Sequence, residues 1–183
     1  YITGKRIVEM VWEDLRPSKI LTRKAFENAI SVAAAAGCST NCPPHVIAVA
    51  RHIGVELKIE DWGKGHDIPL LVNMQPAGEF LGEEFFRAGG VPAVIKELIK
   101  AGRFHTDALT VSGKTMGENH ESVPFSPDRT VVRPYEEPLM PDAGFVILSG
   151  NIFDNAVFKS SVVTPQFREK YIENPAHPGL FEG

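Results

Sequence analysis

The sequence predicts an α/β fold, with helices packed on a mostly parallel sheet. Three observations indicate this class. Apolar residues recur at helical spacing in segments that end at glycines, and these segments alternate with strand patterns. The run Ile68–Met74 is apolar and has the length of a buried strand. With 183 residues, the chain is long enough for one good core, or for one domain and part of another.

The first half of the chain is predicted to be mainly helical. Its clearest helix, which Thr22 would cap, runs to Ala36. It ends at Gly37, because a residue without a Cβ adopts the left-handed conformation at little cost. Residues 55–59 alternate between apolar and polar, which fits either a strand or a bridging loop. The other helices are expected over 7–15, 44–52, 60–62, 79–88, 91–101 and 166–172.

The second half is predicted to contain more extended chain. Residues 107–111 fit a short strand, and Gly113–Thr115 starts another helix. Residues 121–141 are rich in proline and in charges of both signs, which indicates a linker or an extended crossing. Two strands, 144–150 and 156–163, follow, and asparagine, aspartate and glycine supply the turn between them.

Composition excludes several classes of protein. The hydrophobic and charged fractions, 43% and 23%, are those of an ordinary soluble domain, and a net charge of -4 argues against a dedicated nucleic-acid binder. No stretch approaches the roughly 20 apolar residues of a membrane span, and the first residues are not a signal peptide. Two cysteines do not indicate a disulfide framework, so we expect a cytoplasmic protein.

The stretch around which the chain is organised follows the helix stop at Gly37. Ser39, Thr40 and Asn41 are expected at the N-terminus of the next helix, whose free amides and dipole favour an anion. A carboxylate or a phosphate is the natural ligand. The alternative is that these residues only cap the helix, which requires the same residue types.

A second candidate ligand site follows the predicted strand at Ile68–Met74. Gln75 and Asn73 lie where that strand ends, and α/β folds place ligands at the carboxyl ends of parallel strands. An ordinary turn is the alternative for this loop, because Pro76 and Gly78 are common turn residues.

Two other patterns are less persuasive. Cys38, Cys42 and His45 could suggest a metal site, but no fourth ligand is nearby, so small buried hydrophobic residues are the preferred interpretation. Lys114 lies in a sequence like the end of a phosphate-binding loop. The upstream glycine that such a loop requires is missing, since Ala108 occupies its position.

Four stretches carry a resemblance to a known family. Gly37–Asn41 resembles the Gly-Gly-Ser-Thr-Asn signature of the dihydroxy-acid and sugar-acid dehydratases, with Cys38 in place of a glycine. Arg87–Gly90, Asp107–Thr115 and Gly150–Ser161 are similar to further stretches of that family, and the last resembles the entry to its C-terminal β-barrel. The matches occur in the same order and cover most of the chain.

The resemblance implies an activity and its cofactors. These enzymes are hydro-lyases that remove water from a 2,3-dihydroxy acid to give a 2-keto-3-deoxy acid. The resemblance implies an iron–sulfur cluster that acts on the leaving hydroxyl and a Mg²⁺ ion that holds the carboxylate end. The loops Asn73–Gly78 and Asp107–Thr110 are more similar to the aldonate dehydratases than to the branched-chain amino-acid enzymes.

The resemblance also implies which parts of the enzyme this chain carries. The family's cluster cysteines lie in earlier segments and its catalytic serine in a later one, so we expect no catalytic or metal-ligating residue here. The expected domains are 1–125, the late part of the N-terminal α/β domain, then a linker at 126–143 and the start of a β-barrel domain at 144–183. Substrate-binding residues are expected to be Ser39, Thr40, Asn41 and Gln75.

The sequence therefore predicts an internal piece of a sugar-acid dehydratase that is inactive alone and belongs to a homo-oligomer, a dimer or a tetramer. Its expected partner is a small sugar-acid substrate, and we expect it to bind neither nucleic acid nor a membrane. One alternative is the dihydroxy-acid dehydratase of branched-chain amino-acid biosynthesis. Another is a non-catalytic module that kept the fold and lost the chemistry.

Overall fold

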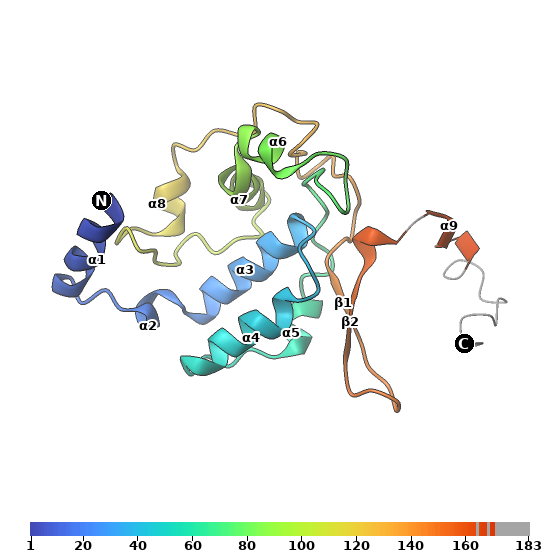
Figure 1. The fold of residues 1–183 in the computed structure, drawn as a ribbon, viewed down its shortest axis with the longest axis horizontal. Coiled ribbons are helices and arrows are strands. Elements are labelled where there is room, and N and C mark those ends of the chain that lie inside the picture. Colours follow the sequence, from blue (N-terminus) through green and yellow to red (C-terminus); the bar gives the residue numbers. More distant parts are fainter. Residues whose placement is uncertain (164, 168, 171–183) are drawn as a thin grey trace.

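The computed structural model describes residues 1–163, 165–167 and 169–170, and Figure 1 shows a helical body followed by a hairpin. The helices are formed mainly by the first two thirds of the chain. The elements are α1 (Ile2–Trp12), α2 (Pro17–Ile20), α3 (Arg23–Ala35), α4 (Cys42–His52), α5 (Ile59–Gly63), α6 (Gly82–Arg87), α7 (Gly90–Lys100), α8 (Met116–His120), β1 (Phe145–Leu148), β2 (Ala156–Lys159), the 3-10 turn η1 (Ser160–Val162) and α9 (Pro165–Phe167).

The predicted stop after α3 is confirmed. Gly37 has a φ of 62°, its N–H donates to the carbonyl of Ala34, and the N–H of Cys38 donates to the carbonyl of Ala33. These two bonds satisfy carbonyls that the end of a helix leaves without an intrahelical partner. A Cβ at position 37 would lie 2.8 Å from Cδ1 of Leu70, so close packing requires glycine here as well.

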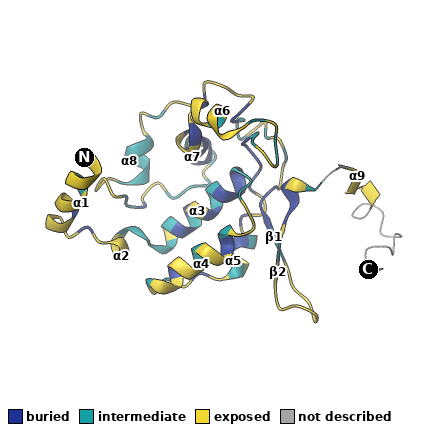
Figure 2. Cartoon of the chain, viewed as in Figure 1, coloured by how far each residue is buried: buried dark blue, intermediate teal, exposed yellow. Residues whose placement is uncertain are grey.

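Two hydrophobic clusters use opposite sides of α3. In the first, α3 and α7 enclose the extended segment that contains Leu71 and Val72. In the second, α3 packs with α4, α5 and the hairpin, where the Trp62 and Phe145 rings meet edge to face with centroids 5.1 Å apart. Because both clusters include α3, this helix is the centre of the body, and Figure 2 shows its buried faces.

The predicted parallel sheet is absent from the residues that the structure describes. Residues 68–72 are buried and 73–74 are half-buried in an extended run, as predicted, but its pairing is limited to isolated bridges. Antiparallel bridges join Leu70 to Met140 and Val72 to Val132, and a parallel bridge joins Met74 to Phe80. The partner segment contains prolines, which have no N–H and therefore cannot continue a ladder. The one sheet found in this part of the chain is the antiparallel pair β1–β2.

The other predicted elements have mixed outcomes. The two strands of the hairpin are confirmed as β1 and β2, with Phe145 opposite Lys159. Residues 55–58 are a loop, Ile59 begins α5, and 107–111 form a single bridge between Leu109 and Thr115 rather than a strand. The helix predicted at 166–172 overlaps α9 only at residues 166 and 167, and residues 168 and 171–183 lie outside the described residues.

The prediction of a first helix over 7–15 is wrong in position. The helix, α1, begins at Ile2 and ends at Trp12, and its apolar residues Val8 and Val11 are exposed (Figure 2). Met10 is the buried residue of α1. An apolar spacing alone does not reveal what lies against a helix, and here α1 projects from the body (Figure 1).

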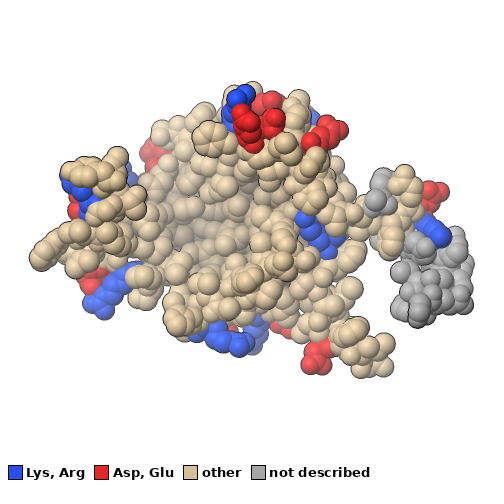
Figure 3. Space-filling model, in the orientation of Figure 1, with Lys and Arg blue, Asp and Glu red and all other residues tan. Residues whose placement is uncertain are grey.

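Among the described residues, we find no helix long and apolar enough to cross a bilayer. On the face shown in Figure 3, acidic and basic side chains form small groups, and neither sign dominates a large area.

Candidate functional site

The turn between α3 and α4, residues 37–41, presents the predicted substrate residues to solvent. The side chains of Ser39, Thr40 and Asn41 are exposed. Asn41 occupies the N-cap position of α4, but its side chain makes no capping hydrogen bond. Ser39 Oγ accepts a hydrogen bond from the Asn41 N–H at 3.2 Å, which orders the turn itself. These side chains are therefore not consumed in capping α4.

The backbone of α4 does not supply the free amides that the sequence led us to expect. The N–H of Cys42 donates to the Ser39 carbonyl at 3.0 Å, and Pro43 and Pro44 have no N–H. A ligand at this turn would therefore bind the Ser39, Thr40 and Asn41 side chains, and the dipole of α4 would still favour negative charge. An anion at this turn would therefore meet side chains rather than free backbone amides.

The two thiols of the turn behave as small hydrophobic groups. Cys38 and Cys42 are half-buried free cysteines and pack against the second hydrophobic cluster. Burial raises the pKa of the Cys38 thiol, and the neighbouring Cys42 raises it further. Among the described residues, no group of three or more histidine, cysteine, aspartate or glutamate side chains could hold a metal ion.

The structure brings the loop that carries Gln75 beside the Gly37 turn. The Cβ of Ala77 lies 3.7 Å from the position that a Cβ at Gly37 would occupy. Gln75 is exposed. Asn73 is instead structural, because its Oδ1 accepts from the Glu79 N–H at 2.9 Å and its Nδ2 donates to the Thr130 carbonyl at 3.2 Å.

Two residues that the sequence analysis missed lie against the same turn. Lys159, the last residue of β2, is 9% exposed, and its ammonium donates to the carbonyl of Gly37. Ser161 Oγ lies 3.8 Å from the Cβ position at Gly37 and is buried without a hydrogen-bond partner among the described residues. Strand alternation could have identified Lys159 from the sequence. Val157 and Lys159 are two residues apart and therefore face the same side of β2, and Val157 packs on the core.

Burial lowers the pKa of Lys159, although the Cys38 and Cys42 thiols oppose this shift. A basic group held in apolar surroundings beside a ligand-binding loop is a common feature of functional sites. We therefore define the candidate site as residues 37–41 together with Gln75, Lys159 and Ser161.

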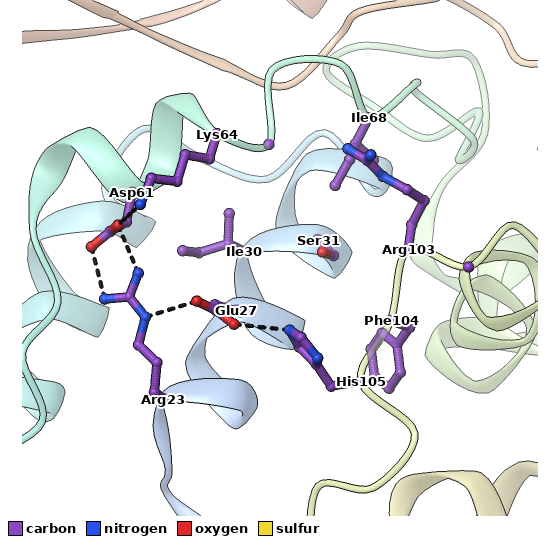
Figure 4. Close-up of a pocket in the computed structure, with 12 residues that line it drawn as sticks. Arg23, Glu27, Ile30, Ser31, Asp61, Lys64, Ile68, Arg103, Phe104 and His105 are labelled. Atoms are coloured by element: carbon purple, nitrogen blue, oxygen red, sulfur yellow. Dashed lines mark hydrogen bonds and ion pairs between the residues drawn. The ribbon is translucent and has the colours of Figure 1, made fainter.

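A second polar region, which we call the charged pocket, lies along α3, beside Arg23, Glu27 and Ile30. It has a volume of about 310 Å³ and is lined by α3, α5 and the loop 102–105 (Figure 4). Arg23 holds Asp61 through two contacts of 2.6 and 2.9 Å and Glu27 through one of 2.8 Å. Lys64 contacts Asp61 at 2.7 Å, and His105 contacts Glu27 at 2.8 Å.

The charges of the charged pocket satisfy one another. Hydrogen bonds from Arg23 hold the pKa of Asp61 well below its usual range, and those to Asp61 raise the pKa of Arg23. Burial raises the pKa of Glu27, but Arg23 and His105 outweigh it and the net shift is downward. Such a network is typical of structural ion pairs, so we assign this region to the scaffold.

Comparison with known proteins gives consistent matches. A family model described as dihydroxy-acid/6-phosphogluconate dehydratase N-terminal matches residues 1–119. The chain is 56% identical over 182 residues to a D-xylonate dehydratase of Caulobacter vibrioides, covering 100% of this chain and 30% of that protein. It is 46% identical over 166 residues to an L-arabinonate dehydratase of Rhizobium leguminosarum bv. trifolii, and the match covers 90% of this chain and 28% of that protein.

A dihydroxy-acid dehydratase of Koribacter versatilis is 45% identical over 150 residues, which cover 81% of this chain and 26% of that protein. The chain therefore spans about 30% of the length of the curated relatives that it matches.

Proposed function

The chain belongs to the dihydroxy-acid/6-phosphogluconate dehydratase family, and we propose that it is part of a longer hydro-lyase that removes water from a sugar acid. The observation that carries this proposal is the 56% identity to a D-xylonate dehydratase along the whole chain, against 45% over a shorter span to a dihydroxy-acid dehydratase. The expected substrate is an aldonate, and the product is a 2-keto-3-deoxy acid.

In this proposal the turn 37–41 and the loop at Gln75 form one wall of the substrate site. A sugar acid carries a carboxylate and several hydroxyls. Ser39, Thr40 and Asn41 offer short polar side chains that can bond both kinds of group, and the dipole of α4 favours the carboxylate. The Gln75 loop supports the proposal because it lies beside this turn.

The cofactors that the family resemblance implies do not fit the described residues. An iron–sulfur cluster in this family needs three cysteines, whereas the two thiols here lie on one turn and burial raises the pKa of Cys38. We therefore place the ligands of the cluster and of Mg²⁺ in other segments of the longer protein. The residues of this chain bind and orient the substrate without taking part in bond breaking.

We extend the proposal to the domains and the assembly. Residues 1–125 would complete an N-terminal α/β domain, 126–143 would link the domains, and β1–β2 would be the first strands of a barrel at 144–183. We place the longer protein in the cytoplasm as a homo-oligomer. The barrel is supported by the outer edges of β1 and β2, which have no further strand partner among the described residues. Unpaired strand edges promote aggregation, and further strands of a barrel would cover them. Light scattering on the full-length protein would measure the oligomer.

The activity is tested with the full-length protein and two sets of substrates. We expect 2-keto acid formation from an aldonate such as D-xylonate or L-arabinonate, and little from dihydroxyisovalerate. A preference for dihydroxyisovalerate would support the branched-chain alternative. Binding of an aldonate without turnover would support a non-catalytic module.

The role of the turn is tested with Asn41→Asp. Aspartate caps a helix as well as asparagine does, so folding should be unaffected, but the new negative charge would repel the substrate carboxylate. We expect KM for the aldonate to rise roughly 10-fold, the equivalent of about 1.4 kcal/mol. Asn151→Asp, on the exposed hairpin loop, is the matched control. Equal KM values in both variants would remove the turn from the substrate site.

A further inference from the structure

Lys159 occupies an unusual position for a lysine. Its side chain is 9% exposed, and among the residues that the structure describes it has no carboxylate partner. Burial of an ammonium without a counter-charge is costly, so such a residue normally has a compensating interaction. Here the ammonium donates to the carbonyl of Gly37, just beyond the C-terminus of α3, where the helix dipole favours a cation.

The carbonyl that Lys159 holds belongs to the peptide group that directs the turn 37–41. On one side of Gly37, its own N–H and that of Cys38 are bonded back to α3. On another side, the α-carbon packs so closely against Leu70 that a Cβ would lie 2.8 Å from its Cδ1. The bond from Lys159 fixes the remaining polar group, the carbonyl, and with it the direction in which the turn leaves α3.

Lys159 itself is held in place by the hairpin. It lies opposite Phe145 in the β1–β2 register, and the Phe145 ring packs against Trp62 of α5 in the second hydrophobic cluster. Figure 1 shows the base of the hairpin beside the end of α3. The hairpin and the turn are 122 residues apart in sequence, so this bond connects distant parts of the chain.

We propose that Lys159 is a positioning residue, which holds the Gly37 carbonyl and thereby sets the orientation of the turn 37–41 toward the substrate. This inference rests on the proposed function, because it takes the turn to be part of the substrate site. It differs from a purely structural role, since loss of the bond would alter substrate binding before it altered folding.

The test uses Lys159→Met in the full-length protein, with two readouts. Methionine keeps the length and apolar stem of the side chain but removes the ammonium. We expect KM for the aldonate to rise roughly 10-fold while kcat stays within about threefold, since one charge-assisted hydrogen bond is lost. Hydrogen exchange of the Gly37, Cys38 and Cys42 amides should accelerate roughly 10-fold, and exchange in α7 should not change.

Two further variants keep the test decisive. Lys159→Arg retains the positive charge and the hydrogen-bond donors, so its KM for the aldonate should lie within about threefold of that of the unsubstituted protein. Lys58→Met, at a mostly exposed lysine, is the matched control and should leave KM and exchange unchanged. If Lys159→Met does not fold, Lys159→Gln, which keeps a neutral donor, replaces it and should show the same changes at smaller size.

The outcomes separate this inference from the proposed function. Unchanged exchange at the turn in both the Met and Gln variants would overturn the positioning role, whatever the activity. A lower kcat with unchanged KM would also overturn it, because a structural defect reduces the amount of active enzyme. If the protein dehydrates no sugar acid but exchange at the turn accelerates, the positioning role stands and the proposed function fails.

Discussion

The charged pocket along α3 and the Gly37 turn beyond its C-terminal end treat charge in opposite ways. In the charged pocket, Arg23, Asp61 and Glu27 form a closed set in which each charge has a partner (Figure 4). At the turn, the buried Lys159 contacts a carbonyl, and the Ser161 hydroxyl has no partner among the described residues. The charged pocket is therefore a less promising ligand site than the Gly37 turn.

This difference shows how to distinguish scaffold from site in a chain without bound ligands. Ion pairs that satisfy each other shift the pKa of both partners, so a perturbed pKa is not evidence of function by itself. Polar groups that are buried and incompletely paired are rare, because their burial is costly. This contrast can be tested by substituting residues in the charged pocket and, separately, at the Gly37 turn.

The largest effect is expected for Asp61→Ala in the charged pocket. Asp61 accepts hydrogen bonds from Arg23, from Lys64 and from the Lys58 N–H at the start of α5. Its removal leaves a partly buried guanidinium poorly paired and a helix start uncapped, so the free energy of unfolding should fall by about 3 kcal/mol. Urea unfolding measures this loss.

Glu56→Ala is the matched control for Asp61→Ala. Glu56 also pairs with a cation, Lys58, but both side chains are mostly exposed, and such pairs contribute little. No measurable loss is expected. Similar losses in the two variants would contradict the assignment of the charged pocket to the scaffold.

A smaller effect on the same region is expected from acid. Because Arg23 lowers the pKa of Asp61 in the folded state, the stabilisation is complete above the unfolded value, about 3.9, and is lost as pH falls through the folded value. The free energy of unfolding should therefore fall below about pH 4, and this slope should flatten in Asp61→Asn. Asp154→Asn, on the exposed hairpin, should keep the slope, and an equal change in both would refute the prediction.

At the C-terminal end of α3, Gly37→Ala tests how tightly the turn is held. Both Gly37 and Gly54 have positive φ, at 62° and 77°, so alanine strains the backbone at each. A Cβ at Gly37 also meets Leu70, whereas one at Gly54 meets nothing within 4 Å. Thermal or urea unfolding should show a loss of about 2 kcal/mol for Gly37→Ala and about 1 for Gly54→Ala. Equal losses would mean that the turn moves freely to accept a Cβ.

Sequence alone predicted the features that depend on local chemistry. The stop at Gly37, the break between α6 and α7 and the start of α8 after Gly113–Thr115 all follow from residue type and spacing, and the structure confirms them. The burial of residues 68–74 was also predictable, because it depends on an apolar run.

The partners of these elements were not predictable. The run 68–74 could not reveal that a proline-containing segment crosses it, and the predicted parallel sheet is not found among the described residues. Arg23 and Asp61 are 38 residues apart, and Lys159 and Gly37 are 122 apart, with no local signal for either pair. The four predicted substrate residues, Ser39, Thr40, Asn41 and Gln75, remain a prediction that rests on the family resemblance and on their placement around one turn.

The smallest effect is expected at two adjacent serines of η1. Both are buried, but Ser160 Oγ donates to the carbonyls of Asp142 and Gly144 at 3.3 and 3.4 Å, whereas Ser161 Oγ has no partner in the described part of the chain. Removal of a bonded hydroxyl leaves carbonyls unpaired, so Ser160→Ala should cost about 1 kcal/mol of unfolding free energy. Ser161→Ala should cost nothing or add up to about 1 kcal/mol, because it removes an unsatisfied group.

The sign of the Ser161→Ala effect decides the contrast between the charged pocket and the Gly37 turn. If both alanine variants lose stability equally in the full-length protein, the Ser161 hydroxyl has a partner there, and the Gly37 turn is as fully paired as the charged pocket. If only Ser160→Ala loses stability, the unpaired hydroxyl is a property of the site. A rise in the KM for the aldonate in Ser161→Ala would then place that hydroxyl, like the turn beside it, in contact with the substrate.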